Sequence, residues 1–555
     1  MWTQNYDPLG SWPLSTGIAA LPVLVLLGLL ASGKVDAWRS ALAGLITAAL
    51  AAIFVFHMPA GMVAAAAMHG VMFAAFRIVW LIVAAVFLYD IAVETGQFEI
   101  MKSSIAQLSG DRRIQAVLVA FSFGAFIEGA AGFGAPVAIS AAFLVGLGFQ
   151  PFQAALLCLI ANTAPVAWGA IGTPIRTLAE ITSLDVEALS ATSGRILPIM
   201  SLILPFWLIK SIASWRDTFA VWPALLVVGG SFAAAQFFWS NFVSFELVDI
   251  IAAVVSLIAG VVLMKVWKPK SEWRFDHDDA TDHLADPSTQ PVPLSTGVVA
   301  RAWMPFMLLS IAVLVWGLPP IKKSFDKHMS WKWEVRGLHL KVNRGEALTG
   351  HQTPVAADAE KAIADIVPVA STGTAVFLAA VISGSLLGLG PLSQARMLER
   401  SIKRLIPAIG TIVCMLALGF VTKSSGMDVV LGLAFTRANA LLYPILGTLL
   451  GWLGVALTGS DTASNVLFGN LQKITATKLG LNPVLMASAN TTGGVMGKMI
   501  DAQSIVVAAA ATGEGGKEGA LLKAALVHSI ALALLVGVIV WTYAHVLPQF
   551  VVEVR

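Results

Sequence analysis

The chain has 555 residues, of which 57% are hydrophobic and only 12% carry a charge. Soluble proteins carry roughly twice that charged fraction, so the composition excludes an ordinary soluble domain. The net charge of +3 says nothing about partners; we expect a lipid bilayer and a small-molecule substrate, and no nucleic acid.

Apolar segments long enough to cross a hydrocarbon core of ~30 Å recur along the whole chain. They predict an all-α polytopic membrane protein with 12–15 transmembrane helices. The first segment is expected to be a retained helix, because no Lys or Arg precedes it as a signal peptide would require. In chain order, the expected spans are 14–31, 38–56, 62–93, 114–127, 152–169, 194–213, 219–239, 246–267, 298–318, 366–389, 402–422, 442–457, 483–500 and 521–547.

Two breaks in the hydrophobic sequence occur twice. The stretch FIEGAAGFGAP (126–136) has a counterpart in ALTGSDTASNVLF (456–468), and each is followed by a proline and an Asn-Thr pair at matching distances. Broken backbone survives in lipid only where it is buried in protein or lines a cavity. Two such segments at matching positions of two halves are typical of a transporter's binding site. We therefore expect two re-entrant hairpins, whose returning arms are 137–149 and 463–478, and two unwound helices.

Charge predicts that the two halves are inverted. The segment 98–113 holds three basic residues, whereas its equivalent 428–443 holds one; conversely, 57–74 holds none and its equivalent 387–404 holds four. Since positive charge marks cytoplasmic loops, equivalent segments are expected on opposite sides of the membrane. The N-terminus is then outside.

This organisation predicts nine consecutive parts. They are the N-terminal helices 1–77, a first repeat 78–176, connecting helices 177–267, a hydrophilic loop 268–297, a helix 298–318, an extramembrane loop 319–365, a flanking helix and basic loop 366–407, a second repeat 408–500, and a C-terminal helix 501–555.

In the first break, glycines surround a carboxylate, Glu128. The glycines Gly129, Gly132 and Gly134 permit a tight reversal. A carboxylate near bilayer depth is costly and is functional by default, so Glu128 is a candidate proton carrier. The alternative is a continuous helix whose small residues pack against a neighbour.

The second break is more polar. Its residues Ser460, Asp461 and Thr462 resemble an N-cap cluster, with Asn465 one turn later. A helix that starts in mid-membrane offers free N–H groups to an anion. Asp461 is the second candidate proton carrier; alternatively, it only caps the helix.

The Asn-Thr pairs supply neutral polar groups beside helix-breaking sequence, and Lys498 supplies a cation. The candidate substrate-binding residues here are Asn162, Thr163, Thr173, Asn490, Thr491, Gly493 and Lys498. Those of the two breaks are Gly129, Gly132, Gly134, Ser460, Thr462 and Asn465. Asn and Thr could instead merely hydrogen-bond between helices, and Lys498 could snorkel to the interface. Arg176, Lys423 and Arg77 are other available cations.

No enzyme constellation, cofactor motif or metal-ligand spacing is found in the sequence. In particular, no Gly-Lys-Ser/Thr phosphate loop is present, which argues against ATP-driven transport.

At these residues the chain resembles the lactate permease family of bacterial monocarboxylate transporters. The matching stretches are NYDPLG (5–10), TGQF (95–98), GAFIEGAAGFGAPVAIS (124–140), FLVGLGF (143–149), ANTAPVA (161–167), GGSFAAAQ (229–236), LLGWLG (449–454), LTGSDTASN (457–465) and ANTTGGVMGKMIDAQSI (489–505).

The resemblance implies a proton symporter of lactate, glycolate and similar 2-hydroxymonocarboxylates in the bacterial inner membrane, with no cofactor besides the coupling proton. More distantly, the layout looks like the ion-transporter superfamily, which implies elevator motion and a homodimer by analogy only. Within transport, a sodium-coupled di- or tricarboxylate carrier and an anion channel remain alternatives. Preference among L-lactate, D-lactate and glycolate stays open, because one methyl group is worth only about 1–3 kcal/mol.

Overall fold

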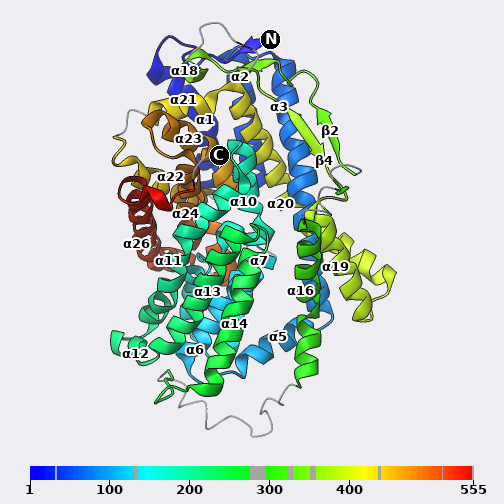
Figure 1. The fold of residues 1–555 in the computed structure, drawn as a ribbon, viewed down its shortest axis with the longest axis vertical. Helices are drawn as coiled ribbons and strands as arrows, with labels where there is room; N and C mark the ends of the chain where they lie inside the picture. The colour runs from blue at the N-terminus through cyan, green and yellow to red at the C-terminus, as the bar shows by residue number, and fades with distance from the viewer. Residues whose placement is uncertain are drawn as a thin grey trace.

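The computed structural model is a bundle of helices with a few short strands (Figure 1). It describes residues 1–31, 34–130, 132, 135–275, 295–318, 321, 324–325, 329–349, 355, 358–435, 439–514 and 517–552. Within these residues, 11 helices are long and apolar enough to cross a membrane, or 12 when one bent pair counts as a span. The predicted all-α polytopic fold is confirmed. The number lies at the low end of the prediction because the helices Thr372–Leu386 and Tyr443–Thr458 are shorter than a full span.

The first half of the chain, with two connecting helices at its end, contains β1 (Trp2–Thr3), α1 (Trp12–Ala31), α2 (Ala37–Phe54), α3 (Ala60–Phe73), η1 (Ala74–Val79), α4 (Trp80–Glu94), α5 (Gln97–Ala106), α6 (Arg112–Ala116), η2 (Val117–Phe123), α7 (Gly124–Ala130), α8 (Ala135–Gly146), α9 (Pro151–Ala161), η3 (Val166–Trp168), α10 (Gly169–Thr182), α11 (Val186–Ile212), α12 (Trp215–Ala220), α13 (Trp222–Phe242) and α14 (Val248–Val266).

The second half contains α16 (Thr296–Gly317), β2 (Trp331–Glu334), β3 (Val342–Asn343), α18 (Glu346–Thr349), β4 (Ile363–Ile366), α19 (Thr372–Leu386), α20 (Pro391–Ser425), α21 (Met427–Phe435), α22 (Tyr443–Thr458), α23 (Asp461–Leu479), α24 (Pro483–Gly497), η7 (Lys498–Ile500), α25 (Ala502–Thr512), α26 (Glu518–His545) and η8 (Pro548–Phe550).

Two helical spans of 35 residues, Ala60–Glu94 and Pro391–Ser425, lie at matching positions of the two halves. Each is followed by a glycine in the left-handed region, Gly96 with φ 71° and Gly426 with φ 83°. They lie side by side and antiparallel: Gly70 meets the backbone of Ala417, whereas Asp90 pairs with Arg404 at 2.8 Å. Antiparallel equivalents are what an inverted repeat requires. The segments 57–74 and 387–404, which the charge comparison treats as loops, prove to be largely the first turns of these helices.

Packing between the halves is also reciprocal. Helix α2 packs on α20, and α19 packs on α4. Helix α10 packs on the hairpin arm α23, and α25 packs on the hairpin arm α8. Each pair is thus matched by its counterpart from the other half, while α13 and α14 follow α11 without a counterpart after α26.

The predicted extramembrane loop 319–365 contains regular structure in its described part. Strand β2 pairs antiparallel with β4, and β3 pairs in parallel with β1 at the N-terminus. The β2–β4 pair lies alongside α3 (Figure 1), where the His69 Nε2 atom is 3.2 Å from the Ile363 carbonyl oxygen. This segment therefore links the N-terminus to α3.

One end of the molecule carries a group of basic residues. Helices α5, α6 and α12 lie at the end opposite the N-terminus and α18 (Figure 1). They carry Lys102, Arg112, Arg113 and Arg216. Because basic residues favour the cytoplasmic side, we expect this end to face the cytoplasm.

The prediction of a second unwound helix over 489–500 is wrong. Helix α24 is regular through Asn490 and Thr491 to Gly497, and the chain leaves it only at the short 3-10 turn η7. The glycines serve packing instead of unwinding. A Cβ atom on Gly493 would overlap the Thr448 carbonyl oxygen of α22, and one on Gly497 would overlap the Trp452 carbonyl oxygen. Small residues thus let two helix backbones approach closely, as they do elsewhere in membranes.

We predict that Gly493→Val destabilises the protein by about 1–3 kcal/mol or more, because overpacking against a backbone atom forces the helices apart. The measurement is the temperature at which the detergent-solubilised protein loses its monodisperse elution peak. The control is Gly28→Val, since no atom lies within 4 Å of a Cβ at Gly28. If the Gly493→Val protein loses its monodisperse elution peak at the same temperature as the wild type, this packing is contradicted.

Candidate functional site

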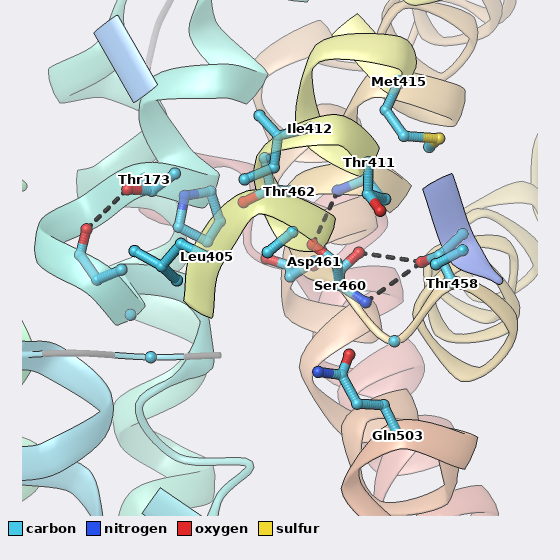
Figure 2. A pocket seen from close by; sticks show the side chains of 18 of the residues that line it. Thr173, Leu405, Thr411, Ile412, Met415, Thr458, Ser460, Asp461, Thr462 and Gln503 are labelled. Atoms are coloured by element: carbon cyan, nitrogen blue, oxygen red, sulfur yellow. Dashed lines mark hydrogen bonds between the residues drawn. The ribbon is translucent and has the colours of Figure 1, made fainter. Parts of the chain in front are cut away.

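A cavity of about 730 Å³ lies where the second hairpin tip, the broken helix α10 and helix α20 meet. Figure 2 shows Ser460, Asp461 and Thr462 beside Thr411 and Ile412 of α20. The cavity is also lined by Glu128, Gly132, Gly169, Thr173, Lys498 and Gln503, and it extends to Asp36, Trp38, Tyr89 and Arg404.

The first tip carries Glu128 into this cavity. Helix α7 ends at Ala130 and α8 begins at Ala135, with Gly132 between them at φ 61°; the predicted site residue Gly134 lies outside the described residues. The Glu128 side chain is buried, and its Oε2 atom has no hydrogen-bond partner among the described residues. Its Oε1 atom rests on Gly169, where a Cβ would come within 2.6 Å. Only a glycine at position 169 leaves room for the carboxyl group.

The first broken helix is confirmed. Helix α9 ends at Ala161, and the chain bends by 64° before it continues as α10. Ala170 and Ile171 are left-handed although neither is a glycine, a strained conformation that is most common at functional sites. The Thr173 hydroxyl lines the cavity and donates to the Ala170 carbonyl at 2.7 Å. Asn162 lies beside Glu128, and both of its amide atoms lack a hydrogen-bond partner among the described residues.

At the second tip, one residue caps helix α23 and a different residue supplies the buried carboxyl group. Ser460, not Asp461, is the N-cap of α23, because its hydroxyl accepts the Ala463 N–H at 3.3 Å. The Asp461 carboxyl instead accepts a short hydrogen bond from the Thr491 hydroxyl on α24, and its Oδ1 atom has no partner within the described chain. The alternative that Asp461 only caps the helix is therefore wrong.

Lys498 is buried and does not snorkel to the interface. Its Nζ atom donates to the Gly459 carbonyl at 2.6 Å and lies 3.2 Å from the carboxylate of Asp501. Its charge acts on both Glu128 and Asp461. The lysine thus ties the second tip to the end of α24 and is shared by the buried acids.

The other cations named from the sequence lie elsewhere. Arg176 pairs with Glu246 at 2.7 Å. Lys423 donates to the Glu180 carbonyl and to the Ser183 hydroxyl near the end of α10. The side chain of Arg77 lies outside the described part of the chain.

Several predicted site residues support the tips without lining the cavity. Asn465 donates to the Thr491 hydroxyl at 3.0 Å and to the Pro174 carbonyl at 3.2 Å, and it accepts from Asn490 at 2.9 Å. Thr163 donates to the Ile160 carbonyl. The bonds of Asn465 connect α10, α23 and α24, so the second tip and the first broken helix are held as one unit.

Sequence reasoning missed two buried acids, Asp249 and Asp501. Asp501 follows directly after η7 and caps α25 by accepting the Ser504 N–H. Asp249 lies in the first turn of α14, against Gly129. The signal for Asp249 was present, because it is a carboxylate inside the predicted span 246–267.

The sequence of this chain is similar to known proteins over nearly its whole length. The family model described as L-lactate permease matches residues 15–547. The glycolate permease GlcA of Escherichia coli K12 is 42% identical, with 100% of both chains covered. The L-lactate permease of Bacillus subtilis 168 is 42% identical over 98% of this chain and 99% of its own, and that of Escherichia coli K12 is 40% identical over 99% and 100%.

These relatives are named permeases, that is, transporters and not enzymes. The family model covers nearly the whole chain, including both hairpin tips and Lys498. The chain belongs to the L-lactate permease family.

Proposed function

We propose that this protein is a proton-coupled symporter of lactate, glycolate and related 2-hydroxymonocarboxylates. The names of its relatives support lactate and glycolate as substrates. Family membership and 11 or more apolar spans in the described residues make it a multi-pass protein of the bacterial inner membrane.

The charge balance of the cavity is the observation that carries proton coupling. Glu128 and Asp461 line the cavity, and Lys498 is already paired with Asp501. An anionic substrate that enters this buried site adds a negative charge to an environment already rich in acids. Uncompensated charge in a medium of low dielectric is costly, so a positive charge must enter with the substrate. A proton on Glu128 or Asp461 supplies it.

The substrate carboxylate would lie near Lys498 and the N-terminus of α23, where the helix dipole favours an anion. Hydroxyl groups of Thr173, Ser460 and Thr462 line the same cavity and could contact the substrate hydroxyl. Apolar residues of α20, Leu405 and Ile412 among them, form the facing wall. A small polar anion with a short apolar part fits this lining.

The cavity reaches Asp36, Tyr89 and Arg404. Arg404 belongs to the basic segment 387–404, which positive charge predicts on the cytoplasmic side. At this mouth the charges are paired: Arg404 binds Asp90, and Asp36 pairs with Arg39. We infer that the structure represents a state open to the cytoplasm. In transport, the tips and α20 would then move relative to each other to expose the site outside.

We predict that cells that express this protein and lack their own lactate permeases accumulate labelled L-lactate in sodium-free buffer when the outside is made more acidic than the inside. Unlabelled glycolate should compete and succinate should not, because the one described cavity-lining cation other than Lys498 is Arg404, which already binds Asp90 and is not available to a second carboxylate. The measurement is initial uptake with each competitor in excess. A strict requirement for sodium, or transport of succinate, would favour the dicarboxylate alternative, and conductance without accumulation would favour a channel.

We further predict that one of the two variants Glu128→Gln and Asp461→Asn retains lactate exchange but loses accumulation. It is the variant of the acid that carries the coupling proton. A neutral amide mimics the protonated acid, so exchange of internal for external lactate should persist in the variant of the true carrier. Accumulation driven by the pH gradient should fall at least about tenfold, which corresponds to about 1.4 kcal/mol of lost coupling. If both variants accumulate lactate at the wild-type rate, neither acid carries the coupling proton.

A further inference from the structure

Asp249 is a buried acid that the proposed function does not yet use. It lies in the first turn of α14, with 1% of its surface exposed. Both carboxylate oxygens lack a hydrogen-bond partner among the described residues. It does not cap its own helix, because Leu247 occupies the N-cap position and no side chain accepts a hydrogen bond there.

The glycine beside Glu128 brings Asp249 close to the first tip. A Cβ atom on Gly129 would lie 2.9 Å from the Asp249 Cβ atom and 3.0 Å from the Ile250 backbone nitrogen. Helix α7 and the start of α14 therefore touch through a residue without a side chain. The carboxyl groups of Glu128 and Asp249 interact electrostatically as a consequence.

No cation among the described residues offsets this pair from the α14 side. Arg176 of α10 is already bound to Glu246, on the loop before α14, at 2.7 Å. On the other side of Glu128, the cation is Lys498, which also serves Asp501 and Asp461. Two like charges buried on contacting turns of α7 and α14 repel each other, so we infer that the pair carries at most one negative charge.

The two acids differ in their access to water. Glu128 lines the cavity and Asp249 does not. Glu128 can therefore exchange a proton with water in the cavity. Asp249 is an inner acid, next to the tip that carries Glu128 but outside the cavity lining. Helix α14, which carries Asp249, has no counterpart in the second half, and this explains why the repeat pattern does not reveal the acid.

We propose that Asp249 is the second carboxyl group of the coupling unit and shares the coupling proton with Glu128. In the loaded site both acids are protonated and the pair is neutral. When the substrate anion dissociates, the O–H bond of Glu128 breaks and its proton passes to water in the cavity, so that one proton and one negative charge remain on the pair. This inference rests on the proposed proton symport.

The test is Asp249→Asn, assayed in proteoliposomes for both lactate exchange and accumulation driven by a pH gradient. We expect exchange within about twofold of wild type and accumulation reduced at least tenfold, as in Glu128→Gln. The double variant Glu128→Gln/Asp249→Asn should lose no more accumulation than either single variant, because residues that act as one unit are not additive. Asp249→Ser serves if the asparagine variant is absent from the membrane.

Asp185→Asn is the matched control, since Asp185 caps α11 by accepting the Ala188 N–H at 2.8 Å and asparagine can do the same. It should leave both activities unchanged. Wild-type accumulation by Asp249→Asn would overturn the proposal, and so would loss of exchange together with accumulation at normal protein amounts. If the wild type itself shows no pH-driven accumulation, the proposed symport fails before the role of Asp249 is reached.

Discussion

The constraint on which the rest depends is the balance of charge in a buried cavity. Glu128 and Asp461 line it, and their shared cation, Lys498, is already paired with Asp501. Such a site cannot accept an anion at low cost unless a positive charge accompanies it. Under the proposed symport, substrate binding and proton uptake are therefore linked through the same atoms. Transport follows if this neutral, loaded site is easier to move across the membrane than a charged one.

The fold maintains this balance through close backbone approaches. Gly169 leaves room for the Glu128 carboxyl, Gly129 admits Asp249, and Gly493 seats α24 on α22. Around the second tip, Asn465 joins α10, α23 and α24 by hydrogen bonds. Buried polar groups that are fully bonded in this way give a rigid frame. The carboxyl oxygens of Glu128 and Asp461 that lack a partner among the described residues stand out against this frame, and we propose that protons and substrate are exchanged there.

Much of this was predictable from the sequence because it depends on local chemistry. The length of the apolar segments predicts the spans, and glycines next to Glu128 and after Thr458 predict the hairpin tips. The doubled Asn-Thr pairs were only half informative, since the first lies at a true break and the second lies within a regular helix. A glycine-rich segment unwinds or packs closely depending on its neighbour, and α22 is that neighbour for Gly493. No local pattern indicates this tertiary contact.

The contribution of α20 and of the α1–α2 junction to the cavity was equally beyond a sequence argument, because Trp38 and Thr411 meet the tips only in the folded chain. Asp249 is a different case. It is a carboxylate in an apolar span, but it falls outside the repeat pattern because α14 has no counterpart in the second half. Acids in unrepeated helices therefore need separate attention in proteins built from internal repeats.

The most direct measurement is the number of protons that enter with each lactate. Purified wild-type protein in sodium-free proteoliposomes would be given labelled L-lactate while a trapped dye reports internal pH and an electrode reports charge movement. The charge balance of the cavity predicts one proton per lactate and no net current. Entry of lactate without a proton, or with a steady current, would contradict it.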